Sequence, residues 1–403
     1  MKYHILLDNI ERSQVFFRMS LSVENDDFVF YTLKPSIYFY FKYYLKVNDI
    51  FLVEGESEGE GEGEGEKVEC ENDIHVLIGR TSNKLAESIY KRVNIYLSKK
   101  SKYTRDDIAI VFNGCQTAAR AFYDFFSDKN VKTLSCEISN LPGKMIFDSK
   151  GVNAQSFLFE NVNLLSEFKS ELSEQQHIDW IHLYEDYKSR PIPQSKIKYK
   201  HAIFSLVDAF FYCFDRGVKE EDGGILTKVA LFLNKVRGSK VNISLGMEQD
   251  LERKYVFFPT QVSTDTQILI NSDVDNFDAI EMICNEVGDF DVYVKIHPAE
   301  QNENVILKYL SLEKDGKITL CKNNTTELIK NAERVYTINS TVGLESLIYN
   351  KPLVVYGRAI YSGMSNEQDV KNFLHGYLVD IDYYGSGYVE QSVFDKLYKI
   401  ASQ

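Results

Sequence analysis

Residues 291–361 contain the two most informative runs of the sequence, DVYVKIHPAEQNENVILKYL (291–310) and ERVYTINSTVGLESLIYNKPLVVYGRAIY (333–361), with a short strand expected at Lys317–Leu320 between them. Each apolar run ends in polar residues and is followed by a segment with helical period, which is typical of repeated βα units and a parallel sheet. Ligands of such sheets bind beyond the carboxyl ends of the strands. The polar residues that follow the strands are therefore the first candidates for a site.

Two polar clusters stand at these strand ends. His297-Pro298 follows one predicted strand, and Asn339-Ser340-Thr341 lies between another and the helix after it. Ser and Thr at a helix start leave backbone N–H groups that bind an anion such as phosphate. Each cluster also has a simpler explanation, a strand end for the histidine and a helix cap for the hydroxyl residues. Their equivalent positions, one strand–helix unit apart, favour half of a nucleotide site.

Length and composition limit the classes of protein. A chain of 403 residues with 44% hydrophobic residues is long enough for two globular domains. The net charge of −13 argues against nucleic acid as a partner, because binding its backbone needs a basic stripe. The six cysteines are scattered without CxxC pairs, which indicates reduced thiols rather than disulfides or a zinc site.

The expected domain organisation is α/β throughout. Neither a signal peptide nor a bilayer-spanning run is expected, so the protein should meet its substrates in the cytoplasm, in solution or peripherally at the inner membrane. The predicted segments are a Rossmann-like domain at 1–246, a second at 247–385 and a terminal helix at 386–403 that could cross back to the first domain. The first domain contains a flexible Gly/Glu insert at 54–69 and a mainly helical region at 160–246.

Several stretches have more than one interpretation. The aromatic segment 36–47 is either a helix buried against the sheet or a surface that faces a membrane or lipid acceptor. HAIFSLVDAFFYCF (201–214) is apolar nearly all round and is expected in the core. Asp106-Asp107 precedes a strand and is interpreted as a solvated turn rather than a metal pair. The sequence lacks a P-loop, a G-x-G-x-x-G loop at a helix start and a G-x-S-x-G elbow.

Two carboxylates stand where a cleft is expected. Glu137 ends the predicted strand VKTLSCE, and Asp265 lies in the loop after the strand Tyr255–Phe258. A surface or capping glutamate and an N-cap aspartate explain these residues equally simply. The sequence alone does not decide between a catalytic and a structural role for either residue.

The motifs together resemble a known family. IVFNG (110–114), SCEISNLPGKMIFDSKGVNAQS (135–156), FFPTQVSTDTQILINS (257–272), VKIHP (294–298) and NSTVGLESLIYNKPLVVYGRAIYSG (339–363) are similar, in order, to blocks of the bacterial capsule polysaccharide biosynthesis proteins. These are the β-Kdo transferases of capsule and O-antigen assembly, related in fold to bacterial sialyltransferases. The resemblance implies a GT-B fold, two Rossmann-like domains with a cleft between them, and a CMP-activated 2-keto sugar acid as donor.

The resemblance also implies roles for residues. His297 would contact the cytidine nucleotide, Ser340 and Thr341 its phosphate, and Asp265 would be the nucleophile of a retaining reaction. Glu137 would do acid/base work, although relatives carry a paired acid followed by glycine where this chain has Cys136-Glu137-Ile138-Ser139. The remaining expected donor-binding residues are Pro298, Lys295, Gln261, Asn339 and Arg358. Lys295 or Arg358 would help to neutralise the departing phosphate.

The hypothesis from sequence is a transferase that adds β-linked Kdo from CMP-Kdo to a glycan acceptor. We expect this acceptor to be lipid-linked. Because CMP is already a good leaving group, no metal or other cofactor is expected. The alternatives are an inverting CMP-sialic acid transferase and a catalytically silent scaffold of a capsule-assembly complex. A chain that stops just after a terminal helix is also compatible with one module of a longer polypeptide.

Overall fold

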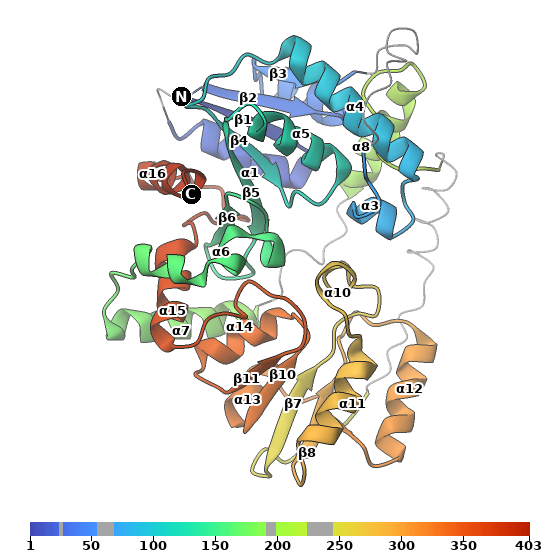
Figure 1. Cartoon of the computed structure of the whole chain (residues 1–403), viewed down its shortest axis with the longest axis vertical. Coiled ribbons are helices and arrows are strands. Elements are labelled where there is room, and N and C mark those ends of the chain that lie inside the picture. Colours follow the sequence, from blue (N-terminus) through green and yellow to red (C-terminus); the bar gives the residue numbers. More distant parts are fainter. Residues whose placement is uncertain (24–26, 55–67, 191–198, 224–244) are drawn as a thin grey trace. The chain divides into compact units, whose positions relative to one another are not determined.

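The computed structural model describes residues 1–23, 27–54, 68–190, 199–223 and 245–403, without the side chains of 199–203 (Figure 1). The chain divides into two compact units. The first comprises Met1–Phe157, Ser173–Val236 and Leu378–Gln403, and the second Leu158–Leu172 and Arg237–Tyr377. The predicted Gly/Glu insert, apart from its ends, and residues 224–244 of the predicted helical region lie outside the described residues.

The first unit is built on a six-stranded sheet of order β3-β2-β1-β4-β5-β6. Its strands are β1 (Lys2–Leu7), β2 (Asp27–Thr32), β3 (Ile50–Leu52), β4 (Ile108–Phe112), β5 (Lys132–Ile138) and β6 (Met145–Asp148). All neighbouring pairs are parallel except β5 and β6, which are antiparallel. The chain runs outward from β1 on one side and from β4 on the other, as in a doubly wound sheet.

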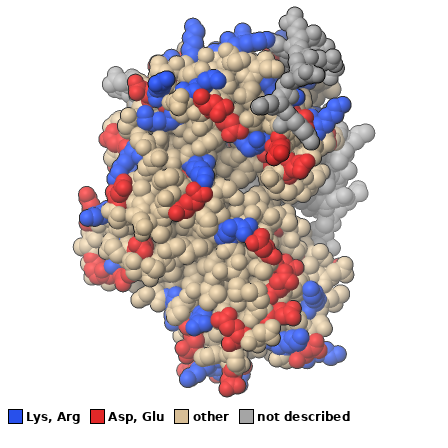
Figure 2. All heavy atoms as spheres, in the orientation of Figure 1, with Lys and Arg blue, Asp and Glu red and all other residues tan. Residues whose placement is uncertain are grey.

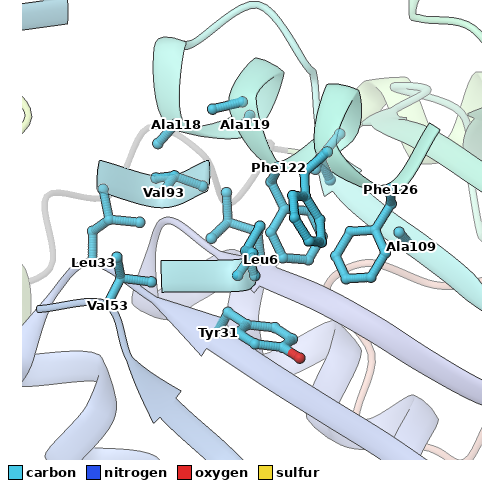
Figure 3. Packing of buried hydrophobic residues seen from close by; sticks show 14 of the residues in the cluster. Leu6, Tyr31, Leu33, Val53, Val93, Ala109, Ala118, Ala119, Phe122 and Phe126 are labelled. Carbon is cyan, nitrogen blue, oxygen red and sulfur yellow. The ribbon is translucent and has the colours of Figure 1, made fainter. Parts of the chain in front are cut away.

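Helices cover both faces of this sheet. On one face, α4 (Asn83–Lys100) and α5 (Thr117–Ser127) pack on strand residues such as Leu6, and Phe122 and Phe126 fill the centre (Figure 3). Tyr3 points to the other face because side chains alternate along a strand. There its ring lies 5.7 Å from that of Phe394 in α16 (Gln391–Ala401). Helix α1 (Ile10–Ser20) also contacts β1.

The second unit contains an all-parallel sheet of order β11-β10-β7-β8-β9. Its strands are β7 (Tyr255–Pro259), β8 (Asp291–Lys295), β9 (Thr319–Leu320), β10 (Arg334–Thr337) and β11 (Leu353–Val355). The helices are α10 (Thr266–Asn271), α11 (Asn276–Glu286), α12 (Glu303–Lys314), α13 (Thr325–Asn331), α14 (Thr341–Ile348) and α15 (Glu367–Lys371). Alternate strand residues feed two cores, one with α11 and α12 and the other with α13. The predicted α/β class with two Rossmann-like domains is confirmed, whereas a cleft between them stays a prediction.

The other described helical elements complete both units. They are α2 (Pro35–Phe39), the π-helix η1 (Tyr40–Tyr44), α3 (Ile74–Leu77), η2 (Asn153–Gln155), α6 (Phe157–Glu160), η3 (Val162–Glu167), α7 (Glu174–Ser189), α8 (Tyr199–Tyr212) and η5 (Asn372–Tyr377). Within the described residues, no helix combines the length and apolar character needed to cross a bilayer. On the face shown in Figure 2, Lys and Arg side chains are interspersed with Asp and Glu rather than gathered in a stripe.

Two predictions about individual segments are wrong. Helix α8 contacts α2 but is not a core helix, because Leu206 and Phe210 are 55% and 58% exposed. Asp107 is not a solvated turn residue, because it is 2% exposed and its carboxylate accepts backbone N–H bonds from Lys2 and Thr104, both at 2.7 Å. In the aromatic segment, Phe41 is buried while Tyr44 is 72% exposed, so the buried-helix interpretation holds for only part of it.

Candidate functional site

The loops after β7, β8 and β10 lie at the carboxyl edge of the second sheet. From β7 the chain proceeds to β8 and β9 on one side, and it then returns to β10 and β11 on the other. The switch point of this sheet therefore lies between β7 and β10, which is where ligands of open α/β sheets bind. Gln261 follows β7 and Asn339 follows β10, so these two predicted residues flank the switch point.

Hydrogen bonds join the two sides of the switch point. The side-chain amide of Gln261 donates to Asn339 Oδ1 at 2.9 Å, and the backbone N–H of Asn339 donates to Gln261 Oε1 at 3.2 Å. Asn276 of α11 fixes the backbone of Gln261 from the other side through bonds of 3.0 and 2.8 Å. Gln261 is 6% exposed, so this bridge is largely shielded from water.

Asp265 is the N-cap of α10. Its Oδ1 accepts the backbone N–H of Gln267 at 2.9 Å, and its Oδ2 accepts the Gln261 amide at 3.3 Å. The capping role that sequence allowed for this residue is thus observed. Its role as a nucleophile stays a prediction.

His297 follows β8 and has a fixed ring. Its backbone N–H donates to Thr260 Oγ1 at 3.0 Å, and its Nδ1 accepts the backbone N–H of Ala299 at 3.1 Å. Partial desolvation of the imidazole lowers the pKa of His297, although the carboxylates of Asp265 and Glu300 act in the opposite sense. The neutral ring keeps its proton on Nε2, which can donate to a ligand. The neighbouring Pro298 is exposed.

The Asn339-Ser340-Thr341 turn opens α14 as predicted. Ser340 is the N-cap, and its Oγ accepts the backbone N–H of Val342 at 3.3 Å, while Thr341 is exposed at the first position of the helix. The hydroxyl of Tyr361 donates to the Ser340 carbonyl and so holds the cap from behind. This approach requires Gly343, because a Cβ there would lie 2.5 Å from Cζ of the Tyr361 ring.

The two expected phosphate-neutralising cations have partners of their own. Lys295 Nζ donates to the carbonyl of Asn323 at 2.6 Å and to Thr325 Oγ1 at 3.0 Å, at the start of α13. The guanidinium of Arg358 pairs with Asp273 at 2.8 Å. These contacts position both side chains within the second unit. Binding of a donor phosphate by either side chain stays a prediction.

Glu300 belongs to this region and was missed in the sequence. Its carboxylate accepts backbone N–H groups from Ser263 at 2.8 Å and from Gln301 and Asn302 at 2.9 Å each. Burial alone would raise its pKa, but these hydrogen bonds outweigh burial and lower the pKa of Glu300. The residue ties the loop after β8 to the loop that carries Asp265. The available signal was a carboxylate three residues after His297.

A separate cavity of about 520 Å³ lies in the second unit beside β11 and α14. Its lining includes Tyr361, Ser362, Ser365 and Lys351, and it includes none of the predicted site residues. The cavity touches the site only through Tyr361, which also holds the α14 cap. We assign the candidate site to the strand ends and not to this cavity.

Glu137 lies in the first unit, at the carboxyl end of β5. The side-chain amide of Asn113 donates to its Oε2 at 2.6 Å, and the backbone N–H of Ile138 donates to its Oε1 at 3.1 Å. Burial raises the pKa of Glu137 even though these bonds and the nearby Arg12 act to lower it. A raised pKa brings a carboxyl group toward the range of a general acid or base at neutral pH.

Other charged residues surround this edge of the first sheet and were also missed. Lys34 Nζ donates to the carbonyl of Asp8 at 2.6 Å and lies 3.5 Å from the Glu220 carboxylate. Asp8 in turn pairs with Arg12 at 2.6 Å. No sequence signal pointed to this cluster, because its members come from separate segments that only the fold brings together.

Comparison with known proteins identifies the family. Residues 141–376, more than half of the chain, match the family described as capsule polysaccharide biosynthesis protein. Protein FixF of Sinorhizobium fredii is 31% identical over 158 residues, which is 38% of this chain and 36% of FixF. The capsule polysaccharide export protein KpsS of Escherichia coli is 32% identical over 127 residues, 28% of this chain and 32% of KpsS. The matched region thus spans about a third of the length of each of these relatives.

Solved structures give looser likenesses. The β-Kdo 2,7 transferase of Thermosulfurimonas dismutans KpsC has a TM-score of 0.47 at 13% identity, covering 100% of this chain and 99% of that one. The β-Kdo 2,4 transferase of the same protein has a TM-score of 0.39 at 15% identity, covering 73% and 87%. At TM-scores under 0.5, such likenesses are too loose to carry over activity. From the match over residues 141–376, the chain belongs to the capsule polysaccharide biosynthesis protein family.

Proposed function

We propose that this protein is a glycosyltransferase that moves Kdo from CMP-Kdo to a glycan acceptor in capsule or O-antigen polysaccharide assembly. The observation that carries the proposal is the hydrogen-bonded bridge between Gln261 and Asn339 at the switch point of the second sheet. Around this bridge stand a neutral imidazole, a helix N-terminus and a carboxylate. Membership of the capsule polysaccharide biosynthesis family supports the context, and the motif resemblance supports the donor.

The proposed donor site uses groups of the second unit. The N–H groups at the start of α14, capped by Ser340, would receive the phosphate, because the positive end of the helix dipole favours an anion. His297 would donate from Nε2 to the cytidine nucleotide. Lys295 and Arg358 would contribute positive charge near the departing phosphate while they keep their present partners.

The proposed chemistry uses two carboxylates, Asp265 and Glu137. Departure of CMP leaves an oxocarbenium-like anomeric carbon, and Asp265 would bond to it and form a covalent adduct. Glu137 would then take the proton of the acceptor hydroxyl while that oxygen bonds to the anomeric carbon and Asp265 leaves. Two displacements give net retention. No step in this scheme is routed through a metal, since CMP is already a good leaving group.

One observation favours a second candidate, an inverting CMP-sialic acid transferase. Both oxygens of Asp265 accept hydrogen bonds, from Gln267 and from Gln261, so the carboxylate would have to share or give up one of these bonds to attack the anomeric carbon. In the inverting route Glu137 alone would act as base, with no covalent step. The raised pKa of Glu137 suits either route.

The test is a donor comparison with the purified chain. We expect CMP release from CMP-Kdo, faster in the presence of an acceptor glycan, and a β-linked product by NMR of the anomeric centre. An α-linked sialoside from CMP-sialic acid would instead establish the second candidate. Calorimetric titration with CMP tests the third alternative, the catalytically silent scaffold. Such a scaffold, with a degraded Ser340 turn, should give no binding heat.

A further inference from the structure

The carboxyl ends of β1, β4 and β5 place three side chains in one row. Ile5 of β1 is opposite Ile110 of β4, and Phe112 of β4 is opposite Cys136 of β5. Continued along each chain, the same register aligns the backbone positions of Asp8, Asn113 and Glu137, and the Asn113 amide donates to Glu137 Oε2 at 2.6 Å. The chain adds strands outward from β1 on one side and from β4 on the other, so the switch point of the first sheet lies between β1 and β4. The row crosses this point.

Arg12 of α1 lies at the Asp8 end of this row and is held from two directions. Its Nη1 donates to Asp8 Oδ2 at 2.6 Å, and its guanidinium carbon lies 4.1 Å from the centre of the Phe112 ring. The side chains of Arg12 and Asp8 are 30% and 11% exposed, so the ion pair is partly shielded from water. A guanidinium with one edge tethered and one face on an aromatic ring is a fixed positive charge.

We infer that Arg12, held in place by Asp8 and Phe112, is a positioning residue that presents a fixed positive charge to Glu137 at the edge of the first sheet. The inference rests on the proposed function, in which Glu137 accepts the proton of the acceptor hydroxyl. Only the ionised carboxylate can accept that proton, and burial works against ionisation. A fixed cation beside the row therefore extends the pH range in which Glu137 can act as a base toward lower pH.

Each group near Glu137 either raises or lowers the pKa of its carboxyl group. Burial raises its pKa, whereas the Asn113 amide, the charge of Arg12 and the Ile138 N–H lower it, and the negative charge of Asp8 raises it. Burial also raises the pKa values of the Cys115 and Cys136 thiols, so both remain neutral near pH 7 and add no charge. Among the charges that act on Glu137, Arg12 is thus positive and Asp8 negative.

Because Arg12 and Asp8 carry opposite charges, removing each charge should move the pH profile of the reaction in an opposite direction. Arg12→Gln removes the cation, so the acid limb of the pH profile of kcat/KM should move to higher pH. Asp8→Asn removes an anion and frees Arg12 to approach Glu137, so the limb should move to lower pH. Arg12→Lys keeps a positive charge and should restore much of the wild-type profile. A merely structural role of Arg12 would lower the rate at all pH values and leave the limb in place.

Arg18→Gln is the matched control, because Arg18 lies on the same helix but donates to the backbone carbonyls of Asp382 and Gly387. Its acid limb should coincide with that of the wild type. Circular dichroism of each variant establishes that the fold is retained before rates are compared.

A second measurement reads Glu137 without turnover. In a pH titration followed by infrared spectroscopy, the carboxylic acid band that disappears in Glu137→Gln reports protonation of this residue alone. If that band titrates at higher pH in Arg12→Gln and the kinetic limb moves with it, the inference stands. If the band moves but the kinetic limb does not, Arg12 holds Glu137 ionised but the proposed role of Glu137 fails. If the band titrates as in the wild type, the inference is wrong.

Discussion

Gln261 and Asn339 form two hydrogen bonds with each other. The Gln261 side-chain amide donates to Asn339 Oδ1 at 2.9 Å, and the Asn339 backbone N–H donates to Gln261 Oε1 at 3.2 Å. The two residues are 78 positions apart in the chain and follow neighbouring parallel strands. Such a reciprocal pair sets the distance between the loop that carries Asp265 and the turn that opens α14. The geometry of the proposed donor site therefore depends on a polar contact rather than on apolar packing.

Replacing Gln261 by Leu should destabilise the protein and weaken binding of CMP. The change leaves the Asn339 N–H without its partner at a partly buried position, which costs about 1 kcal/mol. Urea unfolding and calorimetry with CMP measure the two effects. Gln175→Leu is the control, because the Gln175 amide donates to the exposed Asp179 at the surface, and its cost should stay within about 0.5 kcal/mol. Equal unfolding midpoints for the two variants would contradict the structural role of the bridge.

Asp265 allows its structural and chemical roles to be separated. Asparagine caps helices as well as aspartate does, so Asp265→Asn should fold normally, bind CMP and lose turnover. Asp265→Ala should lose turnover and also about 1 kcal/mol of stability through the missing cap of α10. Asp275→Asn, the same change at the cap of α11, serves as the control and should keep full activity. If Asp265→Asn still turns over the donor, the nucleophile is another group.

Gly343→Ala should disturb the turn at Ser340 from behind. The new methyl group would overlap the ring of Tyr361, whose hydroxyl holds the Ser340 carbonyl. Overpacking of this kind costs about 1–3 kcal/mol, and we expect CMP affinity to fall with it. Gly387→Ala is the control, since a Cβ at Gly387 meets no atom within 4 Å.

The compensating change for Gly343→Ala is Tyr361→Leu, which removes the ring that the methyl group would meet. In a double-mutant cycle, the stability cost of Gly343→Ala should be much smaller in the Tyr361→Leu background than in the wild type. Additive costs would mean that the clash is relieved by another movement.

The sequence predicted what depends on local pattern. Alternating apolar runs followed by helical period gave both sheets, and the Ser340 turn was recognised because an N-cap needs only its own neighbours. The ends of β7, β8 and β10 could be assigned to one edge because parallel strands share it. The Gln261–Asn339 bridge lies within this predictable part, although the hydrogen bonds themselves were not foreseen.

The remaining features depend on contacts between distant segments. The sequence around Lys295 does not indicate that its ammonium group donates to the carbonyl of Asn323, 28 residues later. From sequence, Asp107 is interpreted as a solvated turn residue because it precedes a strand, yet the first strand brings His4 beside it and both are buried. Helix α8 looked like core because its apolar residues surround it, but composition does not tell how many neighbours a helix has. Tertiary packing decided each of these cases, and the sequence pattern does not contain it.

The buried pair of His4 and Asp107 gives a prediction for acid stability. His4 is fully buried in β1, with its Nε2 3.5 Å from Asp107 and its Nδ1 3.2 Å from the Tyr31 hydroxyl. Burial lowers the pKa of His4 from its ordinary 6.5, although Asp107 acts to raise it. Below pH 6.5 the unfolded chain therefore binds a proton at His4 that the folded chain does not yet bind. The free energy of unfolding should consequently fall as the pH falls from 6.5 toward the lower folded pKa.

Urea unfolding of the wild type and of His4→Gln between pH 8 and about pH 5 measures this contribution. Burial also lowers the pKa values of His75 and His297, and their effects have the same sign but cancel in the difference between the two proteins. Asp107 does not interfere, because hydrogen bonds from Thr104 and Lys2 overcome its burial and lower its pKa from 3.8, below the range of the experiment. The stability difference between wild type and His4→Gln should therefore shrink as the solution is acidified. A difference that stays constant with pH would mean that folded and unfolded His4 titrate alike, and that the buried imidazole takes up its proton beside Asp107 without cost.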